Sequence, residues 1–330
     1  MREYLIKRII VSILILWVIA SLNFVIFQVL SPISPEKTVI DPRMTPEVRL
    51  RLRGLFGLDE DMHIRYIKYV INMFTWNFGV SFTSMEPVVD ELSIRLPSTV
   101  LLLGLALIGT ILVGIPLGIL AASRRGSKLD VVAIGSGLVT WGLPTFFIQL
   151  LFMLFFCYYA SVVFGFRIFP PSGISSRPPP IDPLAYMADV ALHLALPLIT
   201  LIIAGFGSWA LYTRSMLVDA LTQDYIVTAR AKGLTERTVL YRHAFRSTLP
   251  PIVTMIALSI PGIISGAMIT EWIFTLPGVG RWYLNSMLAA DYPVVQAVLF
   301  IYAVLMICAN LSSDIIYGVL DPRIRVGSRR

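Results

Sequence analysis

The chain has little charge for its length. Of its 330 residues, 56% are apolar and only 14% are charged, whereas a soluble domain averages roughly 25% charged residues. The charged residues lie in clusters between long apolar runs, and a bilayer core needs about 20 consecutive apolar residues for each helix that crosses it. This pattern excludes an ordinary soluble domain and predicts an integral membrane protein.

Cysteine is scarce, and the common catalytic motifs are missing. The two cysteines, Cys157 and Cys308, both lie inside apolar runs, which favours buried packing residues over a disulfide framework or a zinc site. The sequence holds no G-x-x-x-x-G-K-[ST] phosphate loop, no H-E-x-x-H and no G-x-S-x-G. We therefore expect no ATP hydrolysis, no metal site and no cofactor in this chain. A lone histidine, His193, favours a structural role over a ligand role.

Six apolar runs are long enough to cross a bilayer, and none contains Asp, Glu, Lys or Arg. They are residues 9–30, 99–122, 131–159, 190–213, 249–270 and 294–313. The first run is longer than the apolar core of a signal peptide and ends at no A-x-A-like site, so we interpret it as a retained helix. Small residues such as Gly104, Gly109, Gly114 and Gly118 predict closely packed helices. The sequence thus predicts an all-α, polytopic membrane protein with six transmembrane helices.

Lys and Arg are unequally shared between the segments that connect these runs. With a cytoplasmic N-terminus, the inner segments are 1–8, 123–130, 214–248 and 314–330, and the outer segments are 31–98, 160–189 and 271–293. The inner segments carry 16 of the 27 Lys and Arg residues in 68 positions, and the outer segments carry 11 in 121. This positive-inside bias predicts that both termini are cytoplasmic. It also accounts for the net charge of +7 without nucleic acid as a partner.

We expect three parts along the chain. Residues 1–30 form the first transmembrane helix, residues 31–98 form a long external segment with amphipathic helices, and residues 99–330 form a five-helix core. Within this core, residues 214–248 form the longest cytoplasmic segment.

The external segment shows two helix signals. A cap residue, a proline and an acid at positions 45–47 predict a helix start. Further along, Ile64, Ile67, Ile71 and Phe74 share one face of a helix over residues 63–74. Such a helix either packs on the membrane surface or the helix bundle, or offers a docking surface to an external partner.

The cytoplasmic segment 214–248 predicts two short helices joined at a glycine. Asp224 can cap a helix that begins at Tyr225, and Gly233 can end that helix in a left-handed turn. Thr235 can cap a second helix that runs toward Ser247. The segment is rich in Lys and Arg, so it is either a solvated loop of the positive-inside kind or a basic element that fits a groove on a soluble partner.

The predicted spans contain no acidic or basic residue at mid-depth, where ion-coupled carriers often place titratable groups. Because the phosphate loop is missing too, a transporter of this kind would take its energy from another chain. A channel or a self-sufficient secondary carrier is the alternative, which transport by the purified chain without ATP would support.

Motifs spread over most of the chain carry a family resemblance. The later ones are DYIVTARAKGL (224–234), EWIFTLPGVGR (271–281), DYPVVQ (291–296) and LDPRIR (320–325). The earlier ones are FGLD (56–59), RY (65–66), FGVS (78–81) and RLPST (95–99). Together they resemble the permease subunits of bacterial and archaeal ABC importers of the dipeptide, oligopeptide and nickel type. The long segment after the first run is similar to that of the first permease of the pair.

The resemblance implies a set of partners and a location. Two related permeases pair within the lipid of the cell (plasma or inner) membrane, and each inserts a coupling helix into one of two ATPases, which hold ATP and Mg. An external binding protein delivers the substrate. Peptides are the expected cargo, oligosaccharides or nickel are the alternative, and no substrate-binding residue is assigned.

The resemblance also implies which residues contact the ATPase. These coupling residues are Asp224, Tyr225, Thr228, Ala229, Arg230, Ala231, Lys232, Gly233 and Leu234. The chain departs from the widespread importer motif at one point, since the three residues that replace Glu-Ala-Ala before the glycine, 227–229, include no Glu.

Overall fold

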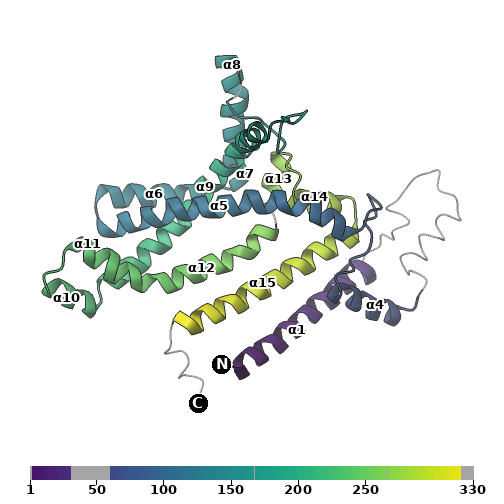
Figure 1. Ribbon diagram of the computed structural model, residues 1–330, viewed down its shortest axis with the longest axis horizontal. Coiled ribbons are helices and arrows are strands. Elements are labelled where there is room, and N and C mark those ends of the chain that lie inside the picture. The colour runs from purple at the N-terminus through teal and green to yellow at the C-terminus, as the bar shows by residue number, and fades with distance from the viewer. Residues whose placement is uncertain (1, 31–59, 167, 266, 321–330) are drawn as a thin grey trace.

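The computed structural model describes residues 2–30, 60–166, 168–265 and 267–320 (Figure 1). Within these residues the chain is helical, and the only extended pairing is an isolated bridge between Val80 and Pro87. The all-α prediction is confirmed. The helix start predicted at 45–47, the motif at 56–59 and the tail from residue 321 lie outside the described residues.

The first and last helices lie side by side. Helix α1 (Arg2–Phe24) continues into a π-helical segment, η1 (Val25–Val29), and α15 (Tyr292–Leu320) runs back along it. The ring of Phe27 lies 5.5 Å from that of Tyr292, so the end of the first helix meets the start of the last. The two helices are therefore antiparallel, as two crossings of one layer in opposite directions require.

Helix α4 (Met62–Phe74) confirms the amphipathic helix predicted over 63–74, and the side that it buries in the bundle is not the isoleucine stripe. Tyr69 and Met73 are buried against α1 and α15, while Ile67 and Ile71 stay exposed. The apolar stripe marked by the isoleucines does not pack on the bundle, because the larger aromatic stripe two residues along takes that place.

The longest helices form the centre of the fold. Helices α5 (Val88–Ser123) and α9 (Pro183–Leu221) pack closely, because a side chain at Gly114 would lie 2.5 Å from Trp209 and one at Gly118 would lie 2.6 Å from the Ala210 carbonyl oxygen. The close packing predicted from small residues is confirmed there, but Gly104 faces open space. The boundary predicted between residues 98 and 99 falls inside α5.

The third predicted span, 131–159, is wrong as one continuous helix. Helix α6 (Lys128–Gly142) ends before Pro144, and a second helical run follows as α7 (Thr145–Met153), η2 (Leu154–Tyr159) and α8 (Ala160–Phe164). Proline disfavours the helical conformation of the residue before it and removes a backbone donor. Leu143 is accordingly extended, with ψ 138°.

The described residues hold five segments that are long and apolar enough to cross a membrane. They are Ile6–Val29, Val88–Ser123, Thr145–Phe164, Pro183–Leu221 and Tyr292–Ser312. Helix α12 (Arg246–Ser265) covers most of the predicted fifth span. The count of six crossings stays a prediction.

The remaining helices lie at two opposite ends of the molecule. The short α10 (Asp224–Ala231) and α11 (Glu236–Thr238) lie on the same side as the first turn of α1 and the last turn of α15, whereas α13 (Met268–Ile273) and α14 (Val279–Leu288) lie far from them (Figure 1). The described parts of the inner segments that hold α10, α11 and the ends of α1 and α15 thus gather on one side, and α14, in a predicted outer segment, lies away from it (Figure 1).

Candidate functional site

The segment predicted to be cytoplasmic, residues 214–248, begins with two helices around a glycine. Gly233 has φ +75°, the left-handed conformation that the sequence predicted. The side chain of Thr235 accepts a hydrogen bond from the Thr238 N–H, which confirms the second cap. The first cap prediction is wrong: Gln223, with ψ 150°, is the N-cap of α10, and Asp224 is the first helical residue. The extended residue that precedes the helix is thus one position earlier than the sequence predicted.

The second helix does not stop near Ser247, where the sequence placed its end. From α11 the chain continues through the π-helical segment η3 (Val239–Phe245) directly into α12. The hydroxyl of Tyr225 lies 2.8 Å from that of Ser247, so α10 is tied to the start of this long helix. The two-helix segment is therefore joined without a break to a helix of the bundle.

Helix α10 is anchored by an apolar side. Ile226 and Ala229 are buried in a cluster with Ile119 of α5, Leu217 of α9 and Val239 of η3. One helix of eight residues thus contacts the inner ends of the long helices α5 and α9 and the segment η3. Ala229 was predicted to contact a partner, but its burial inside the chain makes it an anchor instead.

The opposite side of α10 is open. The predicted coupling residues that are exposed are Asp224, Tyr225, Thr228, Arg230, Ala231, Lys232, Gly233 and Leu234. Two further exposed side chains nearby were not among the predicted coupling residues: Val227, which is 59% exposed, and Tyr241 of η3, which is 51% exposed. The spacing along α10 could have identified Val227, because Val227 and Arg230 lie at positions i and i+3 of one helical face.

One ion pair spans the glycine turn. The Arg230 guanidinium donates two hydrogen bonds to the Glu236 carboxylate, at 2.9 and 3.2 Å. The pair raises the pKa of the Arg230 side chain and lowers that of the Glu236 carboxyl. Both side chains are exposed, so the pair fixes the angle between α10 and α11 while remaining open to a competing partner.

A second ion pair joins the inner ends of α6 and α9. The carboxylate of Asp130 accepts hydrogen bonds from Arg214, at 2.5 and 2.7 Å, and from the Gly126 N–H. These contacts, with the Arg214 hydrogen bond foremost, lower the pKa of Asp130 from 3.8 to about 2. The carboxylate is therefore charged at any physiological pH.

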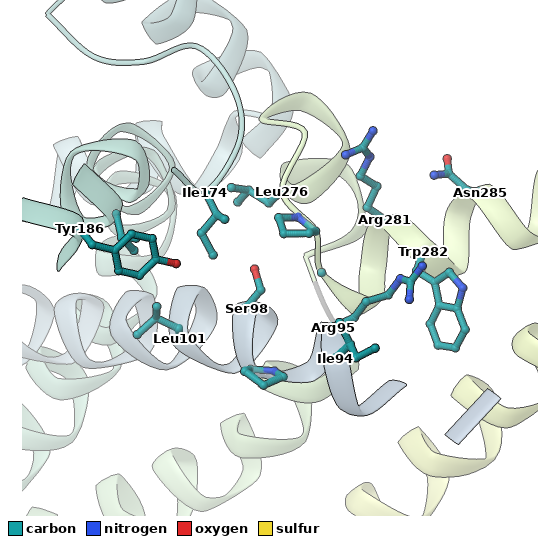
Figure 2. A pocket seen from close by; sticks show the side chains of 14 residues that line it. Ile94, Arg95, Ser98, Leu101, Ile174, Tyr186, Leu276, Arg281, Trp282 and Asn285 are labelled. Atoms are coloured by element: carbon teal, nitrogen blue, oxygen red, sulfur yellow. The ribbon is translucent and has the colours of Figure 1, made fainter. Parts of the chain in front are cut away.

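At the other end of α5 lies a cavity of about 680 Å³. Its lining includes Leu101 of α5, Tyr186 of α9, Leu276, and Arg281 and Trp282 of α14. Figure 2 shows the hydroxyls of Ser98 and Tyr186 turned into a mainly apolar space, with Arg281 at the rim. This outer cavity, built from segments predicted to lie outside, is far along α5 from the α10 anchor.

A buried carboxylate shapes one wall of the outer cavity. Glu271 is 1% exposed and accepts hydrogen bonds from the Thr99 hydroxyl at 2.8 Å and from the Arg281 N–H at 2.9 Å. Burial raises the pKa of this carboxyl, and these hydrogen bonds oppose that effect. A Cβ at Gly278 would lie 2.3 Å from the carboxylate, so any larger residue there would displace the Glu271 side chain from these hydrogen bonds. This contact explains the first of the two glycines in the EWIFTLPGVGR motif.

A second carboxylate brings two of the family motifs together. Asp291, fully buried, accepts hydrogen bonds from the Ser81 hydroxyl at 2.5 Å, the Phe82 N–H at 2.9 Å and the Thr83 N–H at 3.1 Å. The motif at 78–81 is thereby fixed to the one that begins at Asp291. No periodicity in the sequence could have paired residues 210 positions apart.

Comparison with known proteins gives a consistent result over the whole length. Residues 114–326 match the family described as binding-protein-dependent transport system inner membrane component, and residues 1–103 match the N-terminal part of such membrane components. The chain is 36% identical to the oligopeptide transport system permease protein AppB of Bacillus subtilis, over 98% of this chain and 99% of that one. It is 35% identical to the dipeptide transport system permease protein DppB of Escherichia coli, over 86% of each chain. It is 33% identical to DppB of Lactococcus lactis, over 99% of this chain and all of that one.

Proposed function

Because the chain belongs to the family of inner-membrane permeases of binding-protein-dependent ABC importers of the peptide type, we propose that it opens and closes a peptide pathway in response to an ATPase bound at α10. It is a multi-pass inner-membrane protein and a transport permease. The observation that supports the coupling role is the two-sided character of α10, anchored by Ile226 and Ala229 and open at Val227 and Arg230.

The proposed lever works through packing. An ATPase that binds the open side of α10 pushes on a helix whose other side packs against α5, α9 and η3. Close-packed contacts move together, because interfaces of this kind shift between discrete arrangements and do not deform continuously. A displacement of α10 is therefore passed to the inner ends of several helices at once.

The proposed complex contains four further subunits. A second permease completes the pathway, two ATPases bind ATP and Mg and supply the energy, and an external binding protein delivers the substrate. Peptides are the proposed cargo, since relatives that align over almost the entire chain are named for oligopeptide and dipeptide transport. Within this complex the present chain hydrolyses nothing.

Site-directed cross-linking tests the coupling assignment. Cys157 and Cys308 are first replaced by alanine and serine, and a single cysteine carrying a photoreactive maleimide is placed at Val227. In the assembled complex, we expect Val227→Cys to capture an ATPase subunit. The matched control is Ala229→Cys, two residues away but 4% exposed, which should capture none.

Three results would contradict the proposal. One is failure of Val227→Cys to capture an ATPase in a complex that still takes up peptide. Another is equal capture from both positions. The third is labelling of Val227→Cys in intact cells by a thiol reagent that does not cross membranes, because that would place α10 outside.

A further inference from the structure

Helix α4 carries three parallel stripes, each spaced i, i+3, i+7. One consists of Tyr66, Tyr69 and Met73, the second of Arg65, Lys68 and Asn72, and the third of Ile64, Ile67 and Ile71. Residues one position apart are about 100° apart around a helix, and residues two apart about 200°. The isoleucine stripe thus faces roughly opposite the aromatic stripe, with the polar stripe between them.

The aromatic stripe fixes α4 to the end of the first helix. The Tyr66 hydroxyl lies 2.7 Å from that of Ser21, and the Tyr66 ring lies 5.3 Å from that of Phe24 in an edge-to-face contact. Tyr69 also packs on Phe24, with the ring centroids 5.6 Å apart. The contacts of Tyr66 and Tyr69 therefore fall inside the membrane span and not beyond it.

The depth of α4 follows from these contacts. The apolar span of α1 and η1 ends at Val29, so Ser21 lies eight residues, or about 12 Å at 1.5 Å per residue, before that end. Half of the hydrocarbon layer is about 15 Å thick. A helix that contacts α1 at Ser21 and Phe24 is therefore beside the apolar layer and not above it.

The polar stripe indicates which way is outward. Arg65, its first member, donates a 2.9 Å hydrogen bond to Gln28, seven residues closer than Ser21 to the end of the span. Lys68, on the same stripe, pairs with Glu60, just before α4. The charged side of the helix is thus turned toward the outer surface, where long basic side chains reach water.

The isoleucine stripe is much less covered by the protein than the aromatic stripe is. Ile67 is 55% exposed and Ile71 is 54% exposed. Leu22, a residue of α1 that faces away from the bundle, is exposed to the same extent, 54%. A transmembrane helix exposes such side chains to lipid. Because α4 lies at the depth of Ser21 and turns its isoleucines away from α1, this apolar surface continues the one on α1.

We propose that α4 is embedded in the outer leaflet of the membrane, with Ile64, Ile67 and Ile71 in contact with lipid acyl chains and the polar stripe at the headgroups. The described part of the segment after the first helix would then be anchored in the bilayer at α4 before the chain enters α5. An amphipathic helix in this position gains from apolar burial without spanning the membrane.

A nitroxide spin label on the assembled complex in liposomes tests the proposal. Labels are placed singly at Ile67, at Lys68 and at Leu22, after removal of the two native cysteines. Oxygen dissolves in the acyl region and a neutral nickel chelate stays in water, so the two relaxation agents report lipid and water separately. We expect the Ile67 label to respond to oxygen more than to nickel, as Leu22 does, and the neighbouring Lys68 label to respond more to nickel.

Each alternative occupant gives its own result. A stronger response to nickel than to oxygen at Ile67 would place the stripe in water, as a surface open to an external protein. A weak response to both agents would show that protein covers it. Either result overturns the proposal. If Ile67→Cys does not support uptake, Ile64→Cys on the same stripe replaces it.

Discussion

Replacing Gly233 by valine isolates the part of coupling that depends on one backbone angle. The residue has φ +75°, and nothing lies within 4 Å of the position that a Cβ would occupy. The substitution therefore causes no collision, and its cost is the conformational cost of a side chain in the left-handed region, about 1–2 kcal/mol and more for a β-branched residue. A change of that size shifts an equilibrium by roughly 5–30-fold.

The expected result is loss of coupling and not loss of the complex. Relief of the strain changes the angle between α10 and α11, while the anchor formed by Ile226 and Ala229 stays buried. ATP hydrolysis and peptide uptake are measured together in proteoliposomes containing all subunits. We expect Gly233→Val to hydrolyse ATP but to transport several-fold less peptide for each ATP, and Gly233→Asn, which tolerates this conformation better, to lose less.

A matched glycine provides the control. Gly126, in the turn between α5 and α6, has φ +78° and equally open surroundings. Gly126→Val imposes the same strain near the same membrane face, so it should lower stability without changing the ratio of peptide to ATP. Unchanged coupling in Gly233→Val, or an equal loss in Gly126→Val, would refute the assignment of Gly233 as the turn that transmits the motion.

The other predictions concern three charged groups. Arg230→Ala should weaken uptake while the complex still assembles, and full uptake in this variant would argue against an ATPase contact there. Glu271→Gln replaces one carboxylate oxygen by an amide N–H donor, although both oxygens now accept hydrogen bonds, from the Thr99 hydroxyl and the Arg281 N–H. We expect this variant to destabilise the complex by about 1–3 kcal/mol, measured as a lower thermal midpoint. The pKa of Asp130 is lowered to about 2 by Arg214, so its stabilisation is present above about pH 4 and is lost as the pH falls toward 2, by roughly 1–2 kcal/mol after solvent screening. Asp130→Asn should remove that part of the pH dependence of the thermal midpoint, and an unchanged profile would contradict it.

Local signals explain what the sequence predicted well. Long runs without charge define most of the spanning helices, because no other arrangement satisfies the backbone in lipid. The left-handed turn at Gly233 and the cap at Thr235 depend only on residues close in the chain. The polar and apolar stripes of α4 likewise follow from helical periodicity.

Contacts between distant segments explain what it missed. The burial of Ala229 depends on Ile119 and Leu217, and no pattern within α10 distinguishes an alanine that contacts its own chain from one that contacts a partner. Tyr66 and Tyr69 determine which side of α4 packs on α1, because their rings fit against that of Phe24. The sequence pattern does not encode this fit between two helices. The break before Pro144 did have a local signal, the proline itself, which the length of the apolar run concealed.

The same long helices connect the two candidate sites. Helix α5 has 36 residues, about 54 Å at 1.5 Å per residue, and it meets α10 through Ile119 at one end and lines the outer cavity through Leu101 nearer the other. Its partner α9 does the same through Leu217 and Tyr186. Gly114 and Gly118 hold the pair in close contact, so in the proposed mechanism we expect a push at α10 to tilt α5 and α9 together. In the proposed mechanism this tilt carries the work of an ATPase to the outer cavity, without a residue of this chain having to touch both.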